Sequence, residues 1–201
     1  MRGDAVAARR LADKGIPFAE DKGFPYWTAW AHIVRGWALA QSGAPEQGIA
    51  EISRGIDAYV ATGGELARPY ALGLLAQALL LTGQHEPALA ALDEGLRRAR
   101  AGEIHFCEPE LLRLKGSAFL AAGEARSGED CLRRAARSAR RQGAYAFELR
   151  ALTALARSFA ARGRSVDALA LLAEVRSRCP DPRGTPDLEA ADRLLAELGR
   201  A

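Results

Sequence analysis

The sequence predicts an all-α protein, a right-handed α-solenoid in which helical hairpins repeat with a period of 40 residues. Four glycines recur at this interval, Gly43, Gly83, Gly123 and Gly163. A fixed period of roughly 20 to 50 residues is typical of arrays in which one supersecondary unit stacks on the next. Each glycine separates two Ala- and Leu-rich stretches. Because only 6% of the 201 residues are aromatic, Ala and Leu must do most of the packing, which favours close helix contacts over a β-sandwich.

Superposing the segments on their glycines predicts repeats over residues 29–68, 69–108, 109–148 and 149–184. We expect small residues on both sides of the turn to let two antiparallel helices approach closely, while bulky apolar residues at helical spacing fill the space between them. The glycine should adopt a positive φ, end the first helix and turn the chain. The small positions are Gly36, Ala76, Gly116 and Ala156 before the turn, and Gly48, Ala88, Gly128 and Ala168 after it.

The sequence predicts a partial repeat at the N-terminal end of the chain. Residues 4–23 align with the second helix of a unit, with Gly23 at the position that Gly63 has in the next repeat, and the partial repeat covers residues 4–28. We therefore expect the chain to begin partway through a longer array. Pro17 should kink or split this helix, since proline removes one backbone donor and crowds the preceding turn.

Three positions carry signals for the start of a helix. Pro45 and Ser165 follow the turns where second helices should begin, which suits a proline in the first helical position and a serine N-cap. Thr185, followed by a proline and an aspartate, is a further start signal. We therefore predict that residues 185–201 form a C-terminal capping helix.

The order of small and bulky positions resembles the tetratricopeptide repeat (TPR) pattern. In that pattern small, bulky, glycine, small and bulky residues follow one another as they do here, and Pro180 falls where the repeat ends with proline. The period is 40 residues rather than about 34, and we expect the extra residues to lengthen helices and inter-repeat loops. The tryptophan of the first helix is clear only as Trp30, with Tyr70 as its counterpart in the next repeat.

A narrower resemblance covers nearly the whole chain. The strings GFPYWTAWAHIVRGWALA, ELARPYALGLLAQALLLTG, EPELLRLKGSAFLAAG, ELRALTALARSFAARGR and TPDLEAADRLLAEL occur in this order. They resemble the C-terminal TPR-like region of bacterial signalling proteins, in which an adenylate/guanylate cyclase or winged-helix domain precedes a predicted ATPase of the AAA/STAND type. The resemblance implies a regulatory array that receives a protein or small ligand and biases the state of the ATPase. It implies no activity for this chain, because the catalytic domains lie outside it.

The sequence offers no recognisable catalytic site. It contains no GxxxxGK[ST], GxGxxG, HExxH or GxSxG motif. The histidines, His32, His85 and His105, fall at unrelated positions of the repeat, which favours structural roles. Glu108 and Glu110 lie at a helix start, where they interact with the helix dipole. We expect no enzyme, and neither a cofactor nor a metal site.

Cysteine and charge content favour an ordinary cytoplasmic protein. Cys107, Cys131 and Cys179 are odd in number and widely spaced, which indicates neither a disulfide framework nor a zinc site. No apolar run reaches the roughly 18 residues of a membrane span, so no membrane partner is expected. The net charge of +3 is too small to indicate nucleic-acid binding by itself.

The resemblance to TPR arrays implies that the first helix of each repeat lines a concave binding groove. Its N-terminal part is aromatic and its C-terminal part is basic, which suits a protein or peptide partner with an apolar anchor and an acidic group. The alternative is that the aromatic side chains pack against a missing preceding unit or against the adjacent helix. The predicted groove residues are Trp30, Ile33, Trp37, Tyr70, Gln77, Arg113, Ser117, Arg150, Thr153 and Arg157.

A second basic surface leaves two other functions open. This surface consists of Arg126, Arg133, Arg134, Arg137, Arg140 and Arg141. At helical spacing, Arg133, Arg137, Arg140 and Arg141 share one face of a second helix. It is either a solvated face or a contact for an acidic partner or nucleic acid, although no interleaved aromatics support the nucleic-acid version. The remaining alternative is a homodimer formed through an unpaired end of the array and the N-terminal aromatic cluster.

Overall fold

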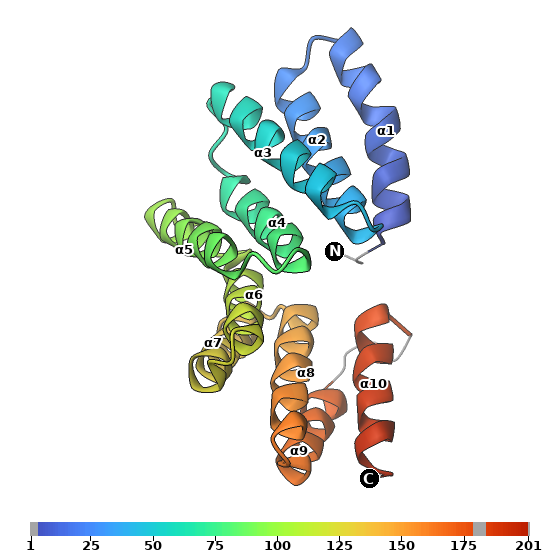
Figure 1. Ribbon diagram of the computed structural model, residues 1–201, viewed down its shortest axis with the longest axis vertical. Helices are drawn as coiled ribbons and strands as arrows, with labels where there is room; N and C mark the ends of the chain where they lie inside the picture. Colours follow the sequence, from blue (N-terminus) through green and yellow to red (C-terminus); the bar gives the residue numbers. More distant parts are fainter. Residues whose placement is uncertain (1–3, 179–183, 201) are drawn as a thin grey trace. The chain divides into compact units, whose positions relative to one another are not determined.

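The computed structural model describes residues 4–178 and 184–200, and within these ranges the chain forms ten α-helices and no β-strand (Figure 1). The all-α prediction is confirmed. The helices are α1 (Ala5–Asp21), α2 (Pro25–Gln41), α3 (Pro45–Ala61), α4 (Arg68–Leu81), α5 (His85–Ala101), α6 (Glu108–Ala121), α7 (Ala125–Arg141), α8 (Tyr145–Ala161), α9 (Ser165–Ser177) and α10 (Pro186–Leu198).

The helices belong to two compact units. The N-terminal unit, Gly3–Cys107, holds α1 to α5, and the C-terminal unit, Glu108–Ala201, holds α6 to α10. Inside each unit every helix packs on the next one, and α2 also contacts α4, as α6 contacts α8. Helix α10 packs on α8 and α9. The single solenoid over residues 1–201 and its repeat boundaries stay predictions.

Glycines with positive φ end the first helix of each hairpin, as predicted. The four glycines of the 40-residue series have φ values of 93°, 72°, 82° and 73°. Such values cost glycine little, because it has no Cβ. The next residue then donates back to the helix end, as the Ala44 N–H does to the Leu39 carbonyl at 3.1 Å. This bond satisfies a carbonyl that the helix leaves open.

The long period arises from long helices and two longer loops. Helices α2, α3, α5, α7 and α8 have 17 residues each. Loops 62–67 and 102–107 precede α4 and α6, which are shorter, with 14 residues each. The extra residues relative to a repeat of about 34 therefore lie in both the helices and the loops, as expected.

Two glycine pairs let the helices of a hairpin touch through their backbones. A methyl group added at Gly48 would lie 2.5 Å from the carbonyl oxygen of Gly36, and one added at Gly36 would lie 2.8 Å from that of Gly48. In the C-terminal unit, a methyl group added at Gly116 would lie 2.9 Å from the carbonyl oxygen of Gly128, and one added at Gly128 would lie 2.9 Å from that of Gly116. The predicted close approach is thus confirmed in the hairpins α2–α3 and α6–α7.

The structure corrects two predictions about helices, one for Pro17 and one for Ser165. Pro17 does not split α1, which continues past it to Asp21 with Ile16 and Ala19 buried on either side; a kink at this position stays a prediction. Ser165 is the first residue of α9 rather than its N-cap, and Arg164 precedes it without a side-chain cap.

Two other start signals are confirmed. Pro45 begins α3, and the Thr185 side chain accepts a hydrogen bond from the Leu188 N–H at 3.2 Å. Pro180 and Cys179 lie outside the described residues.

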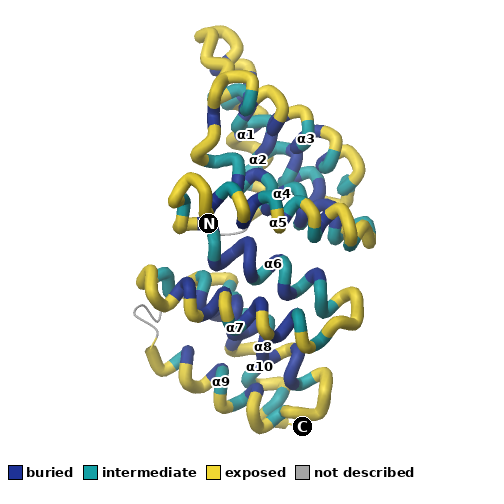
Figure 2. Tube along the Cα trace, turned by 90° about the vertical axis from the view of Figure 1, so that its left-hand side faces the viewer, coloured by how far each residue is buried: buried dark blue, intermediate teal, exposed yellow. Residues whose placement is uncertain are grey.

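The core follows the inner faces of the helices, while the turns are exposed (Figure 2). Ile52, Leu92, Leu132 and Leu172, which are 40 residues apart, are all fully buried. No helix in the described part of the chain is both long and apolar enough to cross a membrane.

Candidate functional site

Six aromatic side chains of the N-terminal unit form one series of ring contacts, which we call the aromatic strip. The ring centroids of successive members lie 5.1, 4.9, 6.2, 6.1 and 6.4 Å apart. Tilted and edge-on rings at such distances attract one another beyond the burial of their surface. In order, the members are Trp27, Tyr26, Tyr59, Trp30, Tyr70 and Phe106.

The repeat period brings the middle of the strip together. Trp30 and Tyr70 are 40 residues apart, so they occupy equivalent positions on α2 and α4, which contact each other. Phe106 comes from loop 102–107 and extends the series beyond α4. The structure thus unites two of the predicted groove residues and adds four aromatic neighbours.

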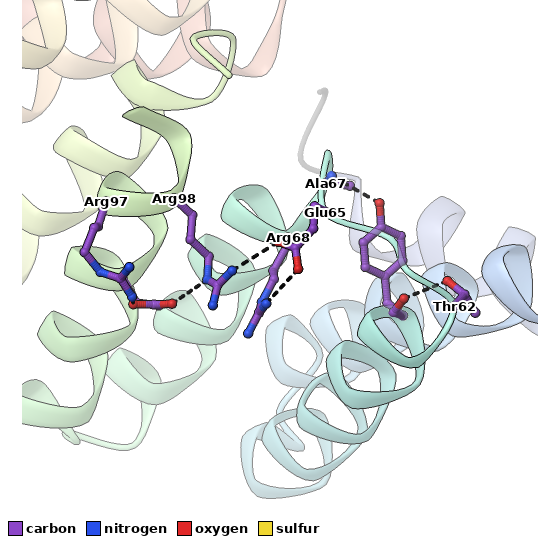
Figure 3. Close-up of polar contacts among 8 residues, drawn as sticks. Thr62, Glu65, Ala67, Arg68, Arg97 and Arg98 are labelled. Atoms are coloured by element: carbon purple, nitrogen blue, oxygen red, sulfur yellow. Dashed lines mark hydrogen bonds and ion pairs between the residues drawn. The ribbon is translucent and has the colours of Figure 1, made fainter. Parts of the chain in front are cut away.

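Tyr59 is the buried member of the strip, and its hydrogen bonds hold it in place. Its side chain is 1% exposed, and its hydroxyl lies 3.0 Å from the Tyr26 hydroxyl. It also accepts a hydrogen bond from the Ala67 N–H at 3.1 Å (Figure 3). Burial, together with the hydrogen bond to Tyr26, raises the pKa of Tyr59. Tyr59 therefore stays a neutral phenol that joins α3 to α2 and to loop 62–67.

Loop 62–67 is tied to two helices by Glu65. Its carboxylate binds Arg68 of α4 at 2.9 Å and Arg98 of α5 at 3.1 Å (Figure 3). Arg98 also pairs with Glu94 on its own helix. These are partly exposed pairs, which are worth little individually, but they hold the loop that carries the Ala67 donor.

The ends of the strip are open to solvent. Trp27 is 60% exposed and Phe106 is 50% exposed, whereas Trp30 and Tyr70 are half-buried. Aromatic side chains dominate the energetics of protein interfaces, most strongly where they are held in place beforehand. The strip therefore combines fixed central rings with two reachable outer rings.

The other predicted groove residues of this unit are tied into the structure. The Trp37 indole donates to the Gln77 side chain at 2.7 Å, which joins α2 to α4. Ile33 is fully buried in the core, so its side chain does not face a groove. Gln77 is half-buried and uses its amide oxygen for Trp37.

Most of the predicted basic groove residues in the C-terminal unit have carboxylate partners. Arg113 donates to buried Glu110 at 3.0 and 2.8 Å. Burial raises the pKa of the Glu110 carboxyl, but the charge and hydrogen bonds of Arg113 outweigh this effect and hold the pKa below its ordinary value. Arg150 pairs with Asp187 of α10 at 2.8 Å. The Arg113 pair lies within α6, whereas the Arg150 pair joins α8 to α10, and neither arginine presents a free charge.

The remaining three residues of that prediction differ in exposure. Arg157 is exposed and Ser117 is half-buried. Thr153 is buried, and its hydroxyl has no hydrogen-bond partner among the described residues. Of the predicted basic part, only the Arg157 side chain is fully available at the surface.

His32 has the structural role that its position predicts. Its Nδ1 lies 2.9 Å from a carboxylate oxygen of buried Glu51, which also accepts from Arg35 at 2.5 Å. Burial raises the pKa of Glu51, but the hydrogen bonds from Arg35 and His32 bring it below its ordinary value. The cluster joins α2 to α3.

The predicted basic face lies on α7. Arg133 binds Glu129 at 3.0 Å, and Arg140 binds Glu148 at 2.7 Å. The other four members are exposed and have no ion pair within the described part of the chain: Arg126, Arg134, Arg137 and Arg141. The charges of Arg133 and Arg140 are therefore neutralised by carboxylates, whereas the other four arginines keep the face positive.

The predicted groove did not include four members of the strip: Trp27, Tyr26, Tyr59 and Phe106. The 40-residue period contains a signal for two of them, because Tyr26 and Phe106 are two periods apart and occupy equivalent positions before or at the start of a first helix. Tyr59 could not be found in this way, since its role depends on the path of loop 62–67 around its ring.

The chain is similar in structure to proteins with TPR-like repeats. A crystal structure of BtubC (BKLC) from P. vanneervenii matches with a TM-score of 0.69 at 12% sequence identity, covering 98% of this chain and 82% of that one. A single-substitution variant of a kinesin light chain-like protein from Podosopora anserina, with nearly identical TPR-like repeats, gives 0.62 at 15% identity, covering 99% and 90%. A second structure of such repeats gives 0.60 at 16% identity, covering 90% of each chain.

These likenesses confirm the TPR-like fold. The chain matches no protein-family model, and no curated protein matches it. Among the described residues, no group of three or more His, Cys, Asp or Glu side chains is placed to hold a metal ion.

Proposed function

We propose that the protein is a non-catalytic TPR-like interaction module that binds a segment of a protein partner along its aromatic strip. The observation that supports this most is the pairing of exposed Trp27 and Phe106 with a fixed centre of Trp30 and Tyr70. A rigid aromatic surface loses little side-chain entropy when a partner binds.

The strip favours a partner with an apolar or aromatic anchor. The acidic group that the sequence predicts in the partner has weaker support, because Arg113 and Arg150 already bind Glu110 and Asp187. Arg157 is the predicted basic residue that remains exposed. The proposal therefore commits to the apolar anchor.

A selection from random displayed peptides tests the proposal. An enriched peptide is then titrated into the wild-type protein and into a Trp27→Ala/Phe106→Ala variant, with affinity measured by calorimetry. We expect enriched sequences to share an aromatic or large aliphatic residue. The variant should bind at least about tenfold more weakly, which corresponds to about 1.4 kcal/mol.

Val166→Ala supplies the matched control. Val166 is an apolar side chain that is 80% exposed on α9 of the other unit. Its removal should leave the affinity unchanged. Peptides that bind both variants as tightly as the wild type would show that the strip is not the binding surface.

The narrower sequence resemblance adds a signalling context to this proposal. In a cyclase- or regulator-linked ATPase of bacteria, occupation of the strip would bias the ATPase only if the partner bound its two states with different affinities. An ATPase rate that changes when the partner is added to a protein containing both parts would support that context.

Self-association is the second candidate function. Leu11 and Phe18 lie seven residues apart, on one face of α1, and are 66% and 63% exposed. Large apolar side chains gathered in this way are typical of contact surfaces. Light scattering coupled to size exclusion should show a dimer that Phe18→Glu dissociates, whereas a monomer at all concentrations would remove this candidate.

A further inference from the structure

A cavity of about 260 Å³ lies in the C-terminal unit, between α7, α8 and α9. Its floor is apolar and is formed by Ala136, Leu152, Leu155, Phe159 and Leu171. All but Leu171 are buried, so the floor belongs to the helix packing itself. Burying an apolar group against such a floor is favourable because it removes apolar surface from water.

The rim of the cavity is cationic. Arg133, Arg137 and Arg140 of α7 line it. Arg133 and Arg140 are bound by carboxylates, but Arg137 is exposed and has no ion pair within residues 4–178 and 184–200. Its guanidinium therefore keeps its five donors for an anion at the cavity mouth.

The surrounding charges are held in place. Buried Glu129 binds Arg133 at 3.0 Å and Arg162 at 3.1 Å. The guanidinium of Arg164 lies 4.0 Å from the centre of the Phe159 ring and that of Arg133 lies 5.7 Å from it. The Phe159 ring, the aromatic part of the floor, thus contacts two cations, which reduces the ordering that a ligand would require.

We infer that this cavity binds a small amphipathic carboxylate, with its apolar chain on the α8 floor and its carboxylate on Arg137. Two observations support this class of ligand. The apolar floor and the cationic rim match the two ends of such a molecule. The volume lies just below the range of drug-sized pockets, about 300 to 1,000 Å³, which suits one short chain rather than a folded partner.

Octanoate is a suitable probe, and the methyl signals of Leu152, Leu155 and Leu171 report its position in the full chain by NMR. We expect saturable shifts of these signals. Octan-1-ol has the same chain without the charge and should bind about tenfold more weakly. Arg137→Gln should weaken octanoate binding by a similar factor, while Arg137→Lys should restore part of it.

Arg134→Gln is the matched control, because Arg134 is exposed on the same helix but does not line the cavity. Its octanoate affinity should equal that of the wild type. Circular dichroism should show that both glutamine variants keep their helices, since neither arginine has an ion pair within the described residues.

Three results would overturn the proposal. Equal binding of octanoate and octan-1-ol would indicate apolar adsorption only. An equal loss with Arg134→Gln and Arg137→Gln would indicate a diffuse charge effect. Displacement of octanoate by duplex DNA, with the same dependence on both arginines, would assign the face to nucleic acid. None of these results depends on the aromatic strip, which lies in the other unit.

Discussion

Glu103 adopts a left-handed backbone conformation with a positive φ, although glycine occupies the equivalent positions of the other repeats. Gly23, Gly63 and Gly143 occur at 40-residue intervals around it and have φ values of 67°, 79° and 65°. Glu103 completes this series with φ at 53°. The left-handed conformation costs a residue with a Cβ about 1 to 2 kcal/mol. A glycine at this position would avoid that cost, but it would lose more entropy on folding, which offsets part of the gain.

Glu103→Gly should therefore raise the free energy of unfolding by about 0.5 to 1 kcal/mol. Urea denaturation measures the change. Glu103→Ala is the control, since it removes the charge but keeps the Cβ, and it should give no comparable gain. A stabilisation by Ala equal to that by Gly would show that charge, not conformation, is responsible.

Gly48 is expected to tolerate no side chain. Its added methyl group would meet the Gly36 carbonyl at 2.5 Å, and backbone cannot move aside cheaply. We predict that Gly48→Ala lowers the free energy of unfolding by about 1 to 3 kcal/mol, as for overpacked cores.

Gly15→Ala provides the contrast to Gly48→Ala. Gly15 lies in α1 with nothing within 4 Å of an added Cβ, so alanine should stabilise the helix by about 0.5 to 1 kcal/mol. Denaturation curves of both variants distinguish close packing from helix propensity. Similar effects from the two substitutions would contradict the backbone contact at Gly48.

Glu51 should make the stability depend on acid pH. Its pKa is lower in the folded chain than in the unfolded chain, so the unfolded state takes up a proton at higher pH. The contribution of the Glu51 cluster is complete above the unfolded pKa and is lost as pH falls through the folded one. We predict that unfolding becomes easier below about pH 5, and that Glu51→Gln gives a flatter acid limb. An unchanged acid limb would remove Glu51 as a source.

At the scale of elements, loop 62–67 depends on one hydroxyl. Tyr59→Phe removes the acceptor of the Ala67 N–H and the contact with the Tyr26 hydroxyl. It should cost about 1 to 2 kcal/mol, because a partly buried donor loses its partner. Hydrogen exchange of the Ala67 amide should become faster.

Tyr26→Phe is the control for this prediction. It removes one of the two partners of the Tyr59 hydroxyl but leaves the bond from Ala67 intact. Ala67 exchange should then stay near the wild-type rate. Faster exchange in both variants would show that ring packing, rather than the hydroxyl, holds the loop.

The order of helices could be predicted from the sequence because glycine turns and buried leucines recur at one interval. Helix starts were harder to predict. The serine of the pair Arg164–Ser165 is a good cap by residue type, yet α9 begins one residue earlier than a serine cap requires. Pro17 shows the converse, since packing of Ile16 and Ala19 outweighs the bond that proline removes.

At the scale of the whole chain, the candidate site could be predicted only in part. The period alone places Trp30 beside Tyr70. The pairing of Arg113 with Glu110 was also readable, because residues three apart on a helix are neighbours. The pairing of Arg150 with Asp187 was not readable, since these residues are 37 apart and meet only when α10 packs on α8.

The central claim is that a protein segment binds on the aromatic strip. The three tryptophans of the chain each give one indole N–H signal in an NMR spectrum. Titration with a selected peptide should shift the signals of Trp27 and Trp30, which belong to the strip. The signal of Trp37, which is bound to Gln77, should change least. Shifts confined to Trp37, or saturation of binding with no change at Trp27 and Trp30, would contradict the claim.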